Sequence, residues 1–302
     1  MQAAGHRCLR YSMYFRKYVE EPMRYISFSC QEYASYGCVI DGSVTDLGKA
    51  SGLPDLAGYI AANFESLGTE TGLAADHALC DIHYLPVIPN PGKVLCVATN
   101  YREPGDEMTK RPDYPLLFSR FAGSQTGHDE PLPKPEVSDK FDYEGELAVI
   151  IGKPGRRIAE ADALAHVAGY TCFNDGSVRD WQKHSSQFTP GKNFARTAGF
   201  GPWMVPRDEL PDPFNLALET RVNGELRQRN NTSRMIFTIP WLISYVSQFA
   251  VLEPGDVIVT GTPSGFGSSR KPPVFLQVGD IVEIEIEKIG TLRNIVATEP
   301  DH

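Results

Sequence analysis

The sequence predicts an α+β fold that is rich in β-structure, and two observations lead to this class. Short apolar runs, many of them β-branched and bounded by Gly, Pro, Asn or Asp, follow one another through most of the chain. Only two segments, 159–166 and 239–249, show the wider apolar spacing that is typical of helices. Because strands and helices do not alternate regularly, the pattern argues against a βαβ chain.

The composition is that of an ordinary globular protein, with 302 residues of which 41% are hydrophobic and 22% are charged. Such a chain can form one large domain, or a large domain and a small one. The net charge of -9 argues against nucleic acids and membrane surfaces as partners. No apolar run approaches the roughly 20 residues of a membrane span. The six cysteines form no CxxC pair, so we predict reduced thiols and a cytoplasmic protein.

The N-terminal third divides into two parts. Residues 1–22 hold four basic residues before any acid, and we predict a disordered extension in preference to a transit peptide. Residues 23–90 form a small domain that begins with a β-hairpin, whose turn is Asp41-Gly42. Three prolines between residues 86 and 91 then mark a boundary, and residues 91–302 form the main domain.

The main domain contains a series of predicted strands in which apolar residues predominate. A further strand covers 169–173, and Asn223-Gly224 predicts a second hairpin turn. The other predicted strands are Val94–Ala98, Leu147–Ile151, Trp203–Val205, Leu216–Val222, Val257–Thr260 and Ile281–Ile286.

The stretch "FDYEGELAVIIG" places three carboxylates, Asp142, Glu144 and Glu146, directly before a buried strand. At this spacing their side chains share one face of a strand. Two negative charges about 4 Å apart repel by roughly 4 kcal/mol at an effective dielectric constant near 20. A buried cluster therefore requires protons, cationic partners or a metal ion. The alternative is a strand that begins at the solvent edge with hydrated acids.

A second acidic residue at a strand end favours a metal site. In "AGYTCFNDGSVRDWQ", Asp175 follows a strand at a turn, where side chains with chemical roles are common. Together with Glu144 and Glu146 it offers three oxygen ligands, which suit Mg²⁺ or Mn²⁺. No His or Cys lies within two residues of these acids, which argues against zinc.

Five motifs make the sequence similar to the fumarylacetoacetate hydrolase (FAH) family over residues 93–295. They are "DYEGELAVIIGKPGR", "AGYTCFNDGSVRDWQ", "GKNFARTAGFGPWMV", "TRVNGELRQRNNTSRMIF" and "LEPGDVIVTGTPSGFG". The resemblance, which extends to bacterial acylpyruvases and 2-hydroxyhepta-2,4-diene-1,7-dioate isomerases, implies a mixed β-roll main domain, a small N-terminal α/β domain and a homodimer. It also implies that Glu144, Glu146 and Asp175 bind the metal and that Asp142 does not.

The same resemblance suggests further site residues. Lys192 and Gln182 are expected to be catalytic, with the Lys192 ammonium reaching a substrate carboxylate or a developing enolate. Arg179 lies one helical turn before Gln182 and is expected to bind substrate or to brace Asp175. Other expected substrate-binding residues are Tyr101, Thr260, Gly261 and Thr262, the last three in a loop that could expose backbone N–H groups or be only a tight turn.

One departure from the family concerns the general base. Hydrolytic members typically carry a His three residues after the tyrosine and a Glu three residues later, but here the His position is Pro104. Glu107 matches the Glu, and we predict that it acts as the base. Alternatives are Asp106, Glu103 and His128, or loss of the water-activating step.

Three functions follow. The first is a Mg²⁺- or Mn²⁺-dependent hydrolase that cleaves a C–C bond in a β-diketo acid of the acylpyruvate or fumarylpyruvate type, as in aromatic catabolism. The second is a decarboxylase or keto–enol isomerase of a 2-oxo dicarboxylate such as oxaloacetate. It needs no activated water and so tolerates Pro104 better. The third is a non-catalytic relative that binds metal and a small acid.

Overall fold

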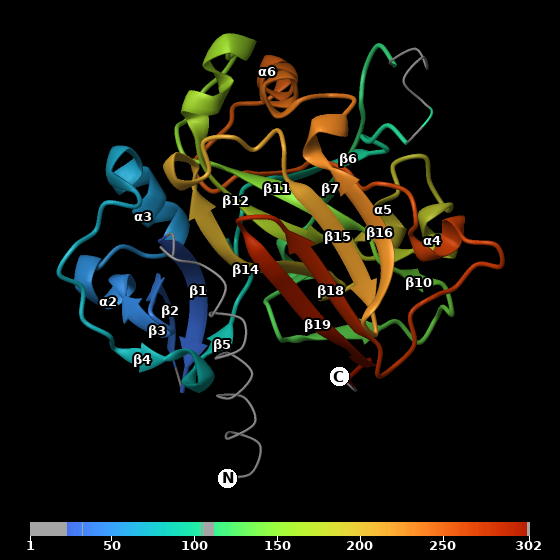
Figure 1. The fold of residues 1–302 in the computed structure, drawn as a ribbon, viewed down its shortest axis with the longest axis horizontal. Helices are drawn as coiled ribbons and strands as arrows, with labels where there is room; N and C mark the ends of the chain where they lie inside the picture. The colour runs from blue at the N-terminus through green and yellow to red at the C-terminus, as the bar shows by residue number, and fades with distance from the viewer. Residues whose placement is uncertain (1–22, 32, 104, 106–111, 301–302) are drawn as a thin grey trace.

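The computed structural model describes residues 23–31, 33–103, 105 and 112–300. Two mixed sheets dominate it, as the strand-rich α+β prediction requires (Figure 1). The larger sheet has the strand order β4-β3-β2-β1-β14-β12-β11-β17-β6-β7, and β5 and β8 pair with β1 and β14. Its strands are β1 (Arg24–Cys30), β2 (Tyr33–Ile40), β3 (Ser43–Asp46), β4 (His77–Ala78), β5 (His83–Tyr84), β6 (Val94–Ala98), β7 (Leu116–Arg120), β8 (Gln125–Thr126), β11 (Gly145–Ile151), β12 (Val167–Asn174), β14 (Ala198–Pro206) and β17 (Val257–Val259).

The second sheet packs against the centre of the first and has the order β16-β15-β18-β19-β9. It is built mainly from two antiparallel hairpins, with β9 added in parallel to β19. Its strands are β9 (Pro131–Lys134), β15 (Ala217–Val222), β16 (Glu225–Asn231), β18 (Ile281–Ile286) and β19 (Gly290–Thr298). A separate pair joins β10 (Phe141–Asp142) to β13 (Ser177–Val178).

Helices are short in the described part of the chain. The α-helices are α2 (Leu47–Ser51), α3 (Leu56–Asn63), α4 (Arg179–Gln182), α5 (Thr189–Lys192) and α6 (Ile239–Phe249), and the 3-10 helices are η2 (Phe64–Ser66), η3 (Leu79–Asp81), η4 (Ala122–Ser124), η5 (Glu160–His166), η6 (Arg207–Glu209), η7 (Thr232–Arg234) and η8 (Gly267–Ser269). The predicted helix 239–249 is confirmed, whereas the pattern at 159–166 forms a 3-10 helix. The helices α2 and α3 were not predicted. Each begins after an aspartate, Asp46 or Asp55, whose side chain accepts a backbone N–H of the first turn.

The strand β11 is buried on both faces, which explains its unbroken apolar run. Leu147 and Val149 belong to the core shared with the second sheet. Ala148 and Ile150 belong to the core on the opposite face. Because side chains alternate along a strand, Glu146 lies on the same face as Ala148. The fold therefore brings Glu146 into a buried layer and away from solvent.

Local turn predictions agree with the structure. Asp41 and Gly42 connect β2 to β3, and Asn223 and Gly224 connect β15 to β16, all four with positive φ. The N-terminal strands continue the larger sheet, because β1 pairs with β14. The domain boundary near residue 90 stays a prediction. The prediction of an extension at residues 1–22 lies outside the described residues.

The prediction that the cysteines are reduced thiols is wrong for Cys80. Cys30, Cys38, Cys96 and Cys172 are free, but Cys80 takes part in a disulfide. Cysteine spacing along the chain did not reveal this bond, because pairing depends on tertiary proximity. No helix in the described part of the chain is long and apolar enough to cross a membrane.

Candidate metal centre and active site

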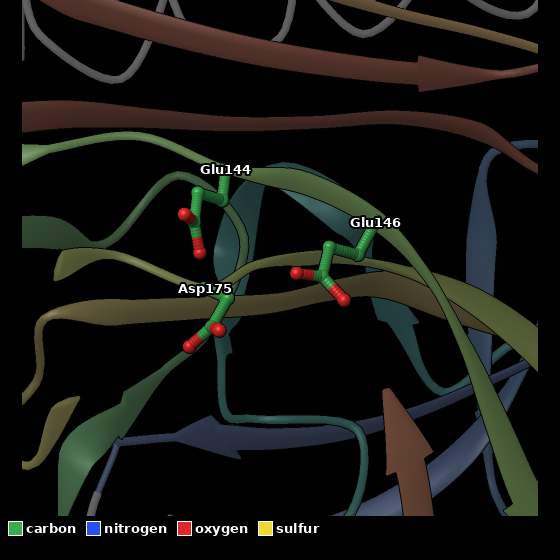
Figure 2. A group of neighbouring side chains, drawn as sticks. All are labelled: Glu144, Glu146 and Asp175. Atoms are coloured by element: carbon green, nitrogen blue, oxygen red, sulfur yellow. The ribbon is translucent and has the colours of Figure 1, made fainter. Parts of the chain in front are cut away.

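Three buried carboxylates converge where β11 begins and β12 ends. The antiparallel register places Gly145 opposite Asn174, so Glu144 and Asp175 are neighbours just beyond the paired residues. The backbone N–H of Asp175 donates to the Glu144 carbonyl at 2.9 Å. One carboxylate oxygen from each of Glu144, Glu146 and Asp175 lies within 4.8 Å of the others (Figure 2). The structure thus brings together the three residues that the sequence predicted as metal ligands.

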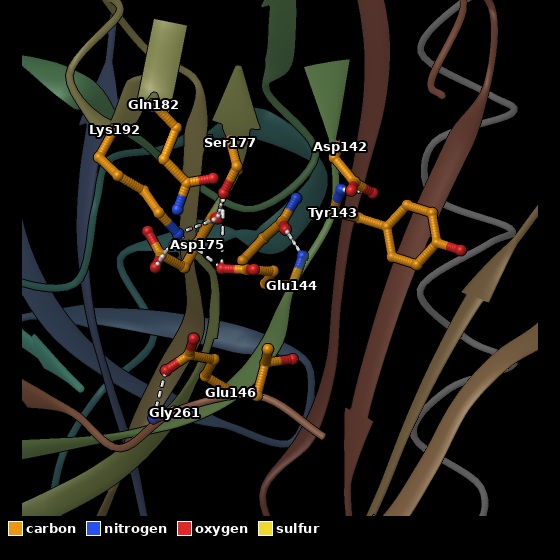
Figure 3. Close-up of polar contacts among 12 residues, drawn as sticks. Asp142, Tyr143, Glu144, Glu146, Asp175, Ser177, Gln182, Lys192 and Gly261 are labelled. Atoms are coloured by element: carbon orange, nitrogen blue, oxygen red, sulfur yellow. Dashed lines mark hydrogen bonds and ion pairs between the residues drawn. The ribbon is translucent and has the colours of Figure 1, made fainter. Parts of the chain in front are cut away.

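Two cations contact Asp175 inside the protein. The Lys192 ammonium lies 2.6 Å from both Glu144 Oε2 and Asp175 Oδ2 (Figure 3). Arg120 Nη1 donates to Asp175 Oδ1 at 2.5 Å and to the Gly176 carbonyl, and its other two nitrogens donate to the hydroxyl groups of Thr197 and Ser124. Both cationic side chains are at most 2% exposed. Such buried pairs persist because each ion loses water but gains close opposite charges.

Arg179 is the third cation, and it contacts the other side of Glu144. Its guanidinium lies 2.8 Å from Glu144 Oε1 and donates to Asp142 Oδ2 at 2.7 Å and to Gln182 Oε1 at 3.2 Å. The expectation that Arg179 braces Asp175 is therefore wrong, because Arg120 occupies that position. The sequence analysis missed Arg120, since a single basic residue at the end of an apolar strand gives no local signal.

Asp142 is separated from the other two carboxylates of its stretch. The expectation that all three share one strand face is wrong, because the chain leaves the β10–β13 pair after Asp142 and enters the larger sheet at Gly145. Asp142 accepts backbone N–H groups of Gly267 and Ser268 and the side chain of Arg179. It anchors a loop and an arginine, in agreement with the expectation that it is not a metal ligand.

The surroundings of Glu144 and Glu146 shift the pKa values of the two side chains in opposite directions. Burial alone would raise the pKa of Glu144, but the charges of Arg179 and Lys192 outweigh it and lower the pKa to about 2. For Glu146, burial raises the pKa well above its ordinary value, and the charges of Asp175 and Glu144 raise it further. Burial would lower the pKa of the Lys192 ammonium, but Asp175 and Glu144 raise it, so Lys192 stays charged.

The donor set fits a divalent metal ion. Four buried carboxylates, those of the cluster and Asp142, face three cationic side chains, so one negative charge is left over. The raised pKa of Glu146 means that, without a metal ion, this carboxyl takes up a proton most readily and so relieves the excess. A hard dication would remove the excess and would find three oxygen ligands, the set that Mg²⁺ and Mn²⁺ prefer.

The loop after β17 contacts the cluster through its backbone. The Gly261 N–H donates to Glu146 Oε2 at 2.5 Å. Gly261 has φ of +100°, and a Cβ there would lie 2.5 Å from the Cβ of Asn100. A residue with a side chain would therefore push this N–H away from Glu146. The hydroxyls of Thr260 and Thr262 donate to the carbonyls of Leu147 and Gly145, which fix the loop against β11.

Gln228 is a second residue that the sequence analysis missed. Its side-chain oxygen accepts the N–H of Gly145, between the two glutamates, and its nitrogen donates to Thr262 Oγ1 and to the Pro263 carbonyl. It is 1% exposed. It therefore joins the second sheet to β11, which carries Glu146, and to the loop after β17, which contacts Glu146.

The remaining residues that the sequence predicted for the site are not members of the carboxylate cluster. Tyr101 is buried, and its hydroxyl has no hydrogen-bond partner among the described residues. Burial raises the pKa of this hydroxyl, and the charge of Glu146 raises it further. Glu103 accepts the Ser264 N–H, and His128 accepts the backbone N–H of Arg293, away from the carboxylates. The predicted base Glu107, with Pro104 and Asp106, lies outside the described residues.

The sequence of residues 93–297 matches the family model described as the fumarylacetoacetate (FAA) hydrolase C-terminal domain. The chain belongs to the FAH family. The oxaloacetate tautomerase YisK of Bacillus subtilis is 45% identical over 223 residues, which cover 72% of this chain and 74% of that protein. The mitochondrial oxaloacetate tautomerase fahd2 of Xenopus laevis is 44% identical over 219 residues, covering 72% and 69%.

Solved structures of family members share the fold. A fumarylacetoacetate hydrolase from Exiguobacterium antarcticum has a TM-score of 0.83 and 35% identity, covering 92% of this chain and all of that one. A maleylpyruvate hydrolase from Sphingobium, in complex with manganese(II) and pyruvate, has a TM-score of 0.76 and 28% identity, with the same coverage. With the buried acidic cluster, the manganese complex supports divalent metal binding by this member of the FAH family.

Proposed function

We propose that this protein is a divalent-metal-dependent keto–enol tautomerase of a 2-oxo dicarboxylate of the oxaloacetate type. The observation that carries the proposal is a buried carboxylate cluster that fits a cation and is paired with the ammonium of Lys192, in a chain that has proline where a hydrolase has its histidine. Relatives that are 44–46% identical, most of them named oxaloacetate tautomerases, support the same conclusion. This activity was the second of the three functions suggested by the sequence, and the similarity to oxaloacetate tautomerases favours it over the first, the hydrolase.

Glu144, Glu146 and Asp175 would hold the metal ion. Bound Mg²⁺ or Mn²⁺ would supply a Lewis acid that polarises the 2-oxo group of the substrate. Lys192 holds a second positive charge at the same place, because its ammonium is fixed by Glu144 and Asp175. Positive charge that is already oriented lowers the energy of an enolate without reorganisation of solvent. Burial of these side chains keeps bulk water away from the cluster.

Tautomerisation moves one proton between a carbon and an oxygen and consumes no water. Hydrolysis of a C–C bond also requires a base that activates water. Glu107 is our candidate for that base, and the hydrolase stays a second proposal, favoured by the similarity to maleylpyruvate hydrolase. Decarboxylation of oxaloacetate would use the same positive charges. If the protein is a hydrolase and Glu107 is the base that activates water, replacing Glu107 by Gln should reduce the rate of hydrolysis about 10²–10⁴-fold.

The test is to follow the enol absorbance of oxaloacetate after it is dissolved, with Mg²⁺, with Mn²⁺ and with chelator. We expect metal-dependent acceleration that Asp175→Asn abolishes. Asp139→Asn is the matched control, because Asp139 is 95% exposed and pairs with Lys134 at the surface. Two parallel assays measure the other activities: release of pyruvate from oxaloacetate reports decarboxylation, and cleavage of an acylpyruvate reports hydrolysis. Faster cleavage of an acylpyruvate than tautomerisation of oxaloacetate would contradict the proposal.

A further inference from the structure

A second cluster of reactive side chains lies in the N-terminal strands, apart from the metal centre. It consists of Cys30 at the end of β1, Tyr33 at the start of β2, Asp46 at the end of β3 and His77 in β4. The Cys30 sulfur lies 3.8 Å from His77 Nδ1. On the other side of the ring, His77 Nε2 lies 2.9 Å from the Tyr33 hydroxyl and 3.9 Å from Asp46 Oδ2.

The contacts determine which ring nitrogen carries the proton. The Tyr33 hydroxyl donates its single proton to Asp46 Oδ2 at 3.2 Å, because a carboxylate only accepts. The same hydroxyl oxygen can then only accept from His77, so the neutral imidazole has its proton on Nε2. Nδ1 is left as the acceptor, and it faces the Cys30 sulfur. The ring is therefore oriented as a base toward the thiol.

Asp46 is itself held in place, so the chain of contacts is rigid. Its Oδ1 accepts the Ser35 hydroxyl at 2.6 Å and the Lys49 N–H at 2.9 Å. Its own N–H donates to the carboxylate of Asp76, the other acid beside the cluster. When a proton moves from sulfur to His77, the resulting imidazolium lies between a thiolate and the charges of Asp46 and Asp76. This is the general pattern of nucleophile, base and orienting acid.

The other free cysteines in the described part of the chain have no such arrangement. Burial raises the pKa of the Cys38 thiol to about 11 and that of Cys172 to about 12, and it also raises the pKa of Cys96. Cys30 is also buried, but it is 6% exposed where the other three are 0% exposed, and the side chain of its neighbour His77 is 20% exposed. Reactive cysteines combine partial access with an adjacent base.

We propose that Cys30 is a site of covalent modification, a thiol activated by His77 that reacts with small soft electrophiles such as hydrogen peroxide. The thiolate sulfur attacks one peroxide oxygen, so that an S–O bond forms and the O–O bond breaks. Sulfur is oxidised by two electrons to a sulfenic acid, and peroxide is reduced to hydroxide. The proton held by His77 Nδ1 converts this hydroxide to water.

The test measures alkylation of each cysteine in the native full-length chain by iodoacetamide, with peptide mapping by mass spectrometry from pH 5 to 9. Cys30 should react at least about 10-fold faster at pH 7 than Cys38, Cys96 and Cys172. His77→Asn should lower the Cys30 rate at pH 7 about 10-fold and change the pH profile of that rate, because the imidazole that accepts the thiol proton is removed. Cys30→Ser should remove the fast reaction.

His83→Asn is the matched control, because His83 also lies in a short N-terminal strand but its side chain is 63% exposed and pairs with Glu130. It should leave the Cys30 rate and pH profile unchanged. Near-ultraviolet circular dichroism verifies that each variant is folded, and Tyr33→Phe provides a milder change that removes the hydroxyl alone. Labelling of peroxide-treated protein with dimedone should occur at Cys30. An equal rate at Cys30 and Cys172, or an unchanged pH profile in His77→Asn, would overturn the proposal.

Discussion

Arg120 provides the sharpest test of the charge argument at the metal centre. The structure shows a fully buried guanidinium that pairs with Asp175 and also donates to the Gly176 carbonyl. Replacing it by methionine keeps much of the side-chain volume but removes one of three cations that face four buried carboxylates. With all four carboxylates ionised, the excess negative charge would rise from one to two.

The expected cost follows from the burial of the pair. Removing one partner of a buried ion pair costs about 3–5 kcal/mol, because the other charge stays in a site without water. A divalent ion supplies the positive charge that the variant lacks, so the cost of Arg120→Met should be smaller in the metal-loaded protein. A loss of packing alone would cost the same with and without metal.

The assay is urea unfolding of wild type and variant in chelator and in excess Mg²⁺. Arg196→Met serves as the control, because Arg196 is 47% exposed and lies 3.5 Å from Glu130. Such a surface pair contributes about 0–1 kcal/mol. Arg120→Lys should recover part of the stability, since it keeps the charge but loses the planar donor geometry. The reasoning fails if Arg120→Met costs under 1 kcal/mol in chelator, or if Mg²⁺ leaves its cost unchanged.

Two further predictions concern the same centre. Gly176→Ala should destabilise the protein by about 1–3 kcal/mol and weaken Mg²⁺ binding, because its Cβ would lie 2.0 Å from the Thr197 carbonyl oxygen. The control is Gly123→Ala, whose Cβ would have nothing within 4 Å. Thermal unfolding compares the stability of the two variants, and calorimetric titration compares their Mg²⁺ affinity. The raised pKa of Glu146 means that the metal-free folded state binds this proton more tightly than the unfolded chain, so its stability should fall as pH rises above 4.5. Melting temperatures from pH 5 to 8 should show a Mg²⁺-induced increase that grows with pH, and Glu146→Gln should remove that growth.

Local sequence determined most of the elements around the site. The helix α6 has the predicted bounds, because Thr238 accepts the Trp241 N–H at its start and apolar spacing specifies its buried face. The strands β6 and β18 also match the prediction, whereas β14 begins five residues earlier than expected. Its first half, Ala198–Pro202, contains two glycines and a proline, which weaken any local strand signal.

The metal centre was also predictable in part from the sequence. Glu146 lies in β11, and Glu144 and Asp175 directly precede β11 and follow β12, two strands whose apolar pattern is clear. Carboxylates in a buried layer require compensation, which indicated a metal ion. Their grouping does not depend on any residue far away in the fold. The pairing of β11 with β12 is enough to bring them together.

The tertiary structure decided which cations and bases these acids meet. Arg120 reaches Asp175 across 55 residues, and Lys192 reaches Glu144 across 48. The same is true of His77, which lies 47 residues from Cys30. A charged or polar side chain in isolation has no local preference that reveals its partner, because Coulomb attraction and hydrogen bonding act through space. The sequence therefore specified the acids of this protein, and the fold specified the groups that control them.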